Sequence, residues 1–110
     1  MNEDQIQASI YKWYHNNFCT KLNTPKHCIF SVPNGGTRGK AEAMKFKATG
    51  LVAGVSDLII IQPNKVLFVE VKTDTGRQQQ NQIEFENTVK ALGFDYILVR
   101  SLQDFIQKLT

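Results

Sequence analysis

The strongest constraint on the fold is a pair of apolar segments joined by a short polar turn. Residues 57–61 read Asp-Leu-Ile-Ile-Ile and residues 66–72 read Val-Leu-Phe-Val-Glu-Val-Lys, with Gln-Pro-Asn-Lys between them. Proline and asparagine suit the centre of a type I turn, so the two segments are predicted to form a β-hairpin. Because both segments are almost continuously apolar, we expect a central position in a sheet that helices cover on both faces.

The rest of the chain alternates between helical and extended patterns. Asn2 with Gln5 three residues later is typical of a helix N-terminus, and the glycines at 50 and 93 are typical of helix ends. The predicted elements are helix 3–19, strand 28–32, helix 41–48, strands 57–61 and 66–72, helix 82–92, strand 94–99 and helix 102–109. The order α-β-α-β-β-α-β-α predicts an α/β sandwich with a central mixed β-sheet, formed by a single domain over residues 1–110.

Charge is distributed unevenly along the chain, and this favours a polyanionic partner. The net charge is +3, but residues 1–56 hold seven basic and three acidic side chains, while residues 57–110 are slightly acidic. A solvated, lysine-bearing surface explains the same pattern equally well. No apolar run approaches the ~18 residues of a membrane span, and the acidic N-terminus does not resemble a secretory signal. A cytoplasmic location is therefore expected, unless a tag or leader was removed.

The only two cysteines, Cys19 and Cys28, lie near His15 and His27, which raises the alternative of a zinc site. Zinc sites are commonly built from closely spaced pairs such as C-x2-C and H-x3-H, and no such pair occurs here. We therefore expect thiols without a metal, and no disulfide in a reducing compartment.

Three charged residues interrupt the two most apolar strands. A two-residue turn at Pro63 and Asn64 places Asp57 opposite Glu70, with Lys72 projecting from the same face as Glu70. Two neighbouring carboxylates repel, so they require a proton, a nearby cation or a divalent metal between them. Oxygen ligands suit Mg2+ or Mn2+, and the lysine is placed to orient a metal-bound water. The alternative is a purely structural ion cluster at the strand ends.

The spacing Asp57-x12-Glu70-x-Lys72 resembles the motif of the PD-(D/E)xK nucleases, whose fold is the restriction-endonuclease-like α/β/α sandwich. Further motifs resemble the VRR-NUC family of small phage and bacterial nucleases. Ordered along the chain, they are Glu3-x-x-Ile6-Gln7, Pro33-Asn34-Gly35-Gly36, Gly54-Val55-Ser56-Asp57, Phe68-Val-Glu-Val-Lys-Thr73, Gly76-Arg77 followed by Gln82, and Leu98-Val-Arg-Ser101. Ser56 replaces the proline usual in the family, a change in a residue that shapes the backbone and binds no metal.

The resemblance implies roles for individual residues. Asp57, Glu70 and the backbone carbonyl of Val71 are implied to bind the metal, and Lys72 to act on the water. Glu3 and Gln82 are implied to complete the catalytic site, with Glu3 a further possible metal ligand. Helix-dipole stabilisation explains Glu3 equally well, and a surface position explains Gln82 equally well. Predicted contacts to nucleic acid are Asn34, Arg38, Lys40 and Arg77, for which an ordinary solvated position is the alternative.

These observations predict a Mg2+- or Mn2+-dependent endonuclease that cleaves DNA, located in the host cytoplasm if the chain is phage-encoded. So small a chain has little surface for base-specific contacts, which favours structure-selective cleavage of branched or nicked DNA. A nucleic-acid-binding module that does not cleave, and a structural protein with an ionic cluster, are the alternatives. A homodimer would provide two active sites, and Phe46, Leu51 and Val52 belong either to its interface or to the core.

Overall fold

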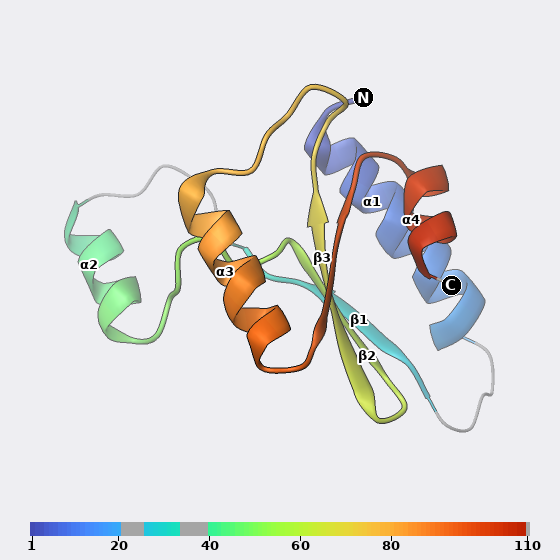
Figure 1. The fold of residues 1–110 in the computed structure, drawn as a ribbon, viewed down its shortest axis with the longest axis horizontal. Coiled ribbons are helices and arrows are strands. Elements are labelled where there is room, and N and C mark those ends of the chain that lie inside the picture. Colours follow the sequence, from blue (N-terminus) through green and yellow to red (C-terminus); the bar gives the residue numbers. More distant parts are fainter. Residues whose placement is uncertain (21–25, 34–39, 110) are drawn as a thin grey trace.

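The computed structural model of the protein describes residues 1–20, 26–33 and 40–109, and its secondary structure follows the predicted order (Figure 1). The elements are α1 (Glu3–Tyr14), a π-helical turn η1 (His15–Cys19), β1 (Cys28–Ser31), α2 (Lys40–Ala48), β2 (Leu58–Gln62), β3 (Lys65–Val71), α3 (Gln80–Ala91), β4 (Asp95–Val99) and α4 (Leu102–Leu109). The predicted first helix is therefore an α-helix whose last part widens into a π-helical turn.

The four strands form one mixed sheet in the order β1-β2-β3-β4. β2 pairs antiparallel with both β1 and β3, and β4 pairs parallel with β3. The predicted hairpin register is confirmed, because Gln62 lies opposite Lys65 and Leu58 opposite Val69. The predicted type I turn is wrong: Asn64 has a φ of 64°, which a type II turn requires at this position and a type I turn does not use.

Helices cover the two faces of the sheet, as Figure 1 shows: α1 and α4 lie on one side of the strands and α3 on the other. Alternate residues of β3 divide between these layers. Val69 and Val71 are fully buried in the core with residues of α1 and α4. Phe68 instead packs edge to face on Phe85 of α3, with the two ring centroids 5.6 Å apart. The predicted α/β/α sandwich with a mixed sheet is confirmed.

The second face of β2 is less covered than its apolar sequence predicts. Leu58 and Ile60 are fully buried beneath α1, but Ile61, on the opposite face, is 45% exposed. The expectation that both faces of this strand are buried is therefore wrong, because α3 packs mainly over β3 and β4.

α2 lies apart from the two helical layers in Figure 1. It is followed by Gly50, whose φ of 108° fits the predicted helix end. Phe46 and Val52 are exposed, so the alternative that these two complete the core is wrong, whereas Leu51 is half-buried. Among the helices of the described ranges, none has the length and apolar character needed to cross a membrane.

Candidate active site

The site forms where the β2–β3 hairpin meets the first turn of α3. Asp57 directly precedes β2, and its Oδ2 accepts a hydrogen bond of 2.8 Å from the backbone N–H of Val71 at the end of β3. The register that pairs Leu58 with Val69 brings the Asp57 carboxylate beside Glu70, as predicted. A bond to the backbone of the neighbouring strand thus fixes the position of Asp57.

Glu70 is almost completely buried, with 1% of its surface exposed. The Nε2 group of Gln82 donates to Glu70 Oε2 at 3.0 Å, while Gln82 Oε1 accepts from the backbone N–H of Gln79 at 2.8 Å. These two bonds require opposite ends of one amide, so they determine its orientation. Gln82 therefore links the start of α3 to the buried carboxylate.

Lys72 follows β3 and is 6% exposed. Its Nζ lies 3.9 Å from Glu70 Oε2, an ion-pair distance that is too long for a hydrogen bond. The backbone N–H of Lys72 donates to Val99 O at 2.9 Å, which continues the parallel pairing of β3 with β4. The sheet therefore places the lysine backbone, and packing rather than a hydrogen bond to Glu70 places its ammonium group.

Burial and mutual repulsion make the carboxylate pair difficult to ionise. Desolvation, followed by the charge of Asp57, raises the pKa of Glu70 to about 8. Desolvation also raises the pKa of Asp57, and the hydrogen bond from Val71 and the charge of Lys72 act in the opposite direction. Without a metal, the pair therefore holds on to a proton to higher pH than two separate carboxyl groups would.

The second oxygen of Glu70 shows why this site suits a cation. Oε1 is buried and has no hydrogen-bond donor within the described part of the chain. When both carboxylates are ionised, neither can donate to the other, so this oxygen needs a proton, a cation or a bound water as its partner. Hard oxygen ligands favour Mg2+ or Mn2+, and the residues present fit such an ion. Residues 1–20, 26–33 and 40–109 contain no preformed group of three or more His, Cys, Asp or Glu side chains around a metal position.

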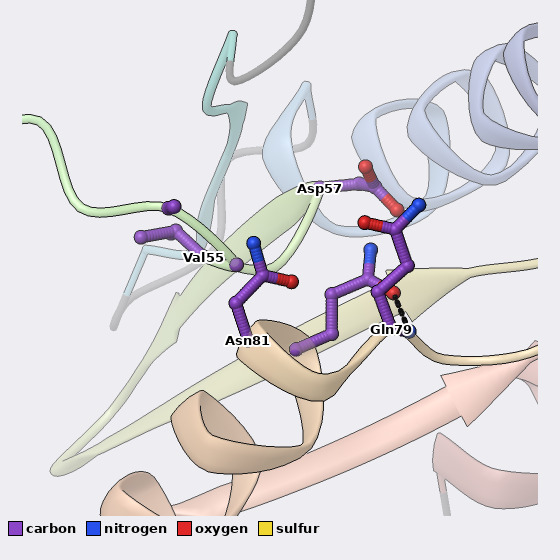
Figure 2. Close-up of a pocket in the computed structure, with 7 residues that line it drawn as sticks. Val55, Asp57, Gln79 and Asn81 are labelled. Atoms are coloured by element: carbon purple, nitrogen blue, oxygen red, sulfur yellow. Dashed lines mark hydrogen bonds between the residues drawn. The ribbon is translucent and has the colours of Figure 1, made fainter.

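An open pocket of about 260 Å3 adjoins Asp57. Figure 2 shows Asp57 on one side of it and Gln79 and Asn81, from the start of α3, on the other. Asn81 Oδ1 is a second buried oxygen without a hydrogen-bond partner among the described residues. The pocket therefore brings polar groups from two elements to the exposed side of the carboxylate pair.

Gly54 allows these two elements to approach each other. Its φ is 88°, and a Cβ added there would lie 2.4 Å from the carbonyl oxygen of Asn81 and 2.9 Å from the backbone nitrogen of Gln82. No side chain fits at these separations, so glycine is required both by the backbone conformation and by the close contact. The sequence signal was the glycine of Gly54-Val55-Ser56-Asp57, whose packing role the sequence did not reveal.

The structure brings together Asp57, Glu70, Lys72 and Gln82. Glu3 lies in the first turn of α1, where its charge contributes to the raised pKa of Glu70, but it does not join a three-ligand group. Asp4, which the sequence did not single out, acts similarly on the pKa of Asp57. The start of α1 therefore adds negative charge beside the pair, and metal binding by Glu3 stays a prediction.

The predicted nucleic-acid contacts are placed only in part. Asn34 and Arg38 lie outside the described residues, and Lys40 is the first residue of α2. Arg77 is exposed in the segment between β3 and α3. Their contacts with nucleic acid stay predictions, as does metal binding by the Val71 carbonyl.

Comparisons with known proteins agree with this fold. A family model described as the VRR-NUC domain matches residues 1–103. A solved structure described as a VRR_NUC domain protein superposes with a TM-score of 0.76 at 22% sequence identity, over 99% of this chain and 85% of that chain. No curated protein shows significant sequence similarity.

Proposed function

Because this chain belongs to the VRR-NUC family, within the PD-(D/E)xK nuclease superfamily, we propose that it is a divalent-metal-dependent endonuclease that hydrolyses phosphodiester bonds of DNA. The observation that carries the proposal is the buried Asp57–Glu70 pair, which has an unsatisfied carboxylate oxygen, a lysine beside it and an open pocket at its edge. Nucleases of this superfamily typically use divalent metals.

In this proposal Asp57, Glu70 and the Val71 carbonyl hold Mg2+ or Mn2+. The bond from Val71 N–H keeps Asp57 in place, and the Gln82 amide keeps Glu70 in place, so neither carboxylate needs to reorganise on binding. When bound, the ion polarises the scissile phosphate and lowers the pKa of a coordinated water.

Lys72 is proposed to orient the attacking water and to stabilise charge that develops at the phosphate. The water loses a proton to solvent as its oxygen forms a bond to phosphorus, the opposite P–O bond breaks, and the leaving oxygen takes up a proton from solvent. Because the Lys72 ammonium lies 3.9 Å from Glu70 Oε2, it retains donors for these partners.

We further propose that the enzyme selects DNA by structure more than by base sequence, with branched or nicked DNA as its substrate. Base-specific DNA complexes typically bury about 1,000–2,500 Å2 of protein surface. The chain has 110 residues and a total accessible surface of 7436 Å2, so the larger of these interfaces would take up about a third of it. A DNA-binding module that does not cleave is the competing function.

The test is cleavage of supercoiled plasmid, linear duplex and a labelled branched DNA with Mg2+, Mn2+ or EDTA. The variants are Glu70→Gln and Lys72→Met, and the matched control is Lys90→Met, which removes a lysine from an exposed ion pair with Glu86. We expect metal-dependent cleavage, preferentially of branched DNA, that only the control retains. Binding without cleavage under all conditions would establish the non-cleaving module instead.

A further inference from the structure

Arg100 lies between β4 and α4 and reaches across to the loop that follows Lys72. Its Nη1 donates hydrogen bonds to the carbonyl oxygens of Thr73 at 2.6 Å and Gly76 at 2.7 Å. These residues bracket the turn after β3, in which Gly76 N–H also donates to Thr73 O at 3.2 Å. Arg100 lies 27 residues after Thr73 and 24 after Gly76, so one guanidinium nitrogen from a distant part of the chain holds both ends of this loop.

The backbone of Arg100 is itself firmly held. Its N–H donates to Asp104 Oδ2 at 2.9 Å, and the Asp104 N–H donates to Ser101 Oγ at 3.0 Å. These bonds form the start of α4, whose Phe105 is fully buried in the core. The guanidinium is thus anchored to a helix that packs on the opposite layer from α3.

The loop that Arg100 closes lies against the side chain of Lys72. A Cβ built at Gly76 would lie 3.5 Å from Lys72 Cδ, so the lysine stem runs beside this glycine with room for no more than a methyl group between them. Since Nζ is 3.9 Å from Glu70 Oε2, no short bond to Glu70 fixes the ammonium group. The position of the ammonium therefore depends on how the loop packs around its stem.

We propose that Arg100 is a positioning residue for Lys72: it fixes the 73–76 loop, and through this loop the ammonium group at the carboxylate pair. This inference rests on the proposed nuclease function for its effect on cleavage, but the placement of Lys72 itself is independent of activity. Two adjacent residues at the end of β4 hold Lys72 and the loop that follows it. Val99 O accepts a hydrogen bond from the backbone N–H of Lys72, and Arg100 donates to the loop carbonyls.

The test compares Arg100→Met, which keeps the length of the side chain but has no donors, with Arg100→Lys, which restores a donor. The control is Lys65→Met, which removes an exposed lysine at the opposite end of β3 from Lys72. Unfolding curves first identify a temperature at which all variants are folded.

The activity-independent readout is the NMR spectrum of the protein after reductive 13C-methylation of its lysines, with the Lys72 signal assigned by its loss in Lys72→Arg. Hydrogen exchange of amides 73–77 is measured on the same variants. We expect Arg100→Met to shift or broaden the Lys72 signal and to speed amide exchange at least tenfold. The control leaves both unchanged, and Arg100→Lys restores them in part.

In cleavage assays we expect kcat of Arg100→Met to fall about 10- to 100-fold, the effect of small misplacements of reacting groups, with KM for DNA and Mn2+ affinity unchanged. An unchanged Lys72 signal, or a changed signal with normal kcat, overturns the inference. If the wild-type protein cleaves no DNA, the proposed function fails, whereas the NMR and exchange measurements still decide whether Arg100 positions Lys72.

Discussion

Replacement of Gly54 by alanine tests directly how the site is assembled. The new Cβ would lie 2.4 Å from the carbonyl oxygen of Asn81 and 2.5 Å from its carbonyl carbon. To reach ordinary van der Waals separation, the first turn of α3 must move away by about 1 Å. That turn carries Gln82, so the hydrogen bond to Glu70 is expected to break.

Two other glycines provide controls for the backbone conformation. Gly50 and Gly93 have φ values of 108° and 91°, close to the 88° of Gly54, but a Cβ at either position meets nothing within 4 Å. Alanine there costs only the positive-φ strain, about 1–2 kcal/mol. At Gly54 the overlap adds about 1–3 kcal/mol, as overpacking of a filled site does.

The assay is urea and thermal unfolding of the three alanine variants beside the wild type, with cleavage measured on each folded protein. The extra cost at Gly54 corresponds to a melting temperature roughly 5–20 °C below those of the controls for a domain of this size. We expect only Gly54→Ala to lose cleavage. A free energy of unfolding within about 0.5 kcal/mol of both controls would refute the close-packing argument.

Three further predictions concern the carboxylate pair. Because the pKa of Glu70 is raised from 4.5 to about 8, the folded protein binds more protons than the unfolded chain between these pH values, so the metal-free protein should lose stability as pH rises through this range. In Glu70→Gln the plot of melting temperature against pH should be flatter. An equally steep plot in the variant would contradict the assignment of the proton to the carboxylate pair. Mg2+ should raise the melting temperature more at pH 8.5 than at pH 6, because at pH 6 it must displace the proton held by the carboxylate pair. Titration calorimetry of Mg2+ binding in two buffers of different ionisation enthalpy should detect the released proton. Binding without proton release would contradict this exchange. Gln82→Glu should lower the free energy of unfolding by about 1–3 kcal/mol, because it places an acceptor where Glu70 needs a donor, and added Mn2+ should restore the loss. The measurement is denaturant unfolding, with Gln80→Glu, an exposed change in the same turn, as the control. Equal losses in the two variants would argue against the role of the Gln82 amide.

The confirmed parts of the sequence-based prediction depend on local rules. A two-residue turn and the alternation of side chains along strands were enough to predict that Asp57 and Glu70 meet. The capping pair at Asn2 and Gln5 was predicted in the same way, and each of these residues donates its backbone N–H to the side chain of the other. Such features involve residues that are close in sequence or related by a short turn, so one periodic pattern determines them.

Other features depend on how distant segments pack, and the sequence alone did not reveal them. The Gln82 amide reaches Glu70 only because Gly54 lets α3 approach closely, and the Arg100 guanidinium reaches the loop after Lys72 only because β4 pairs parallel to β3. The uncovered face at Ile61 likewise follows from where α3 packs. A chain that must bury its apolar strands still has several helix placements available, and the tertiary structure decides which polar groups surround the two carboxylates.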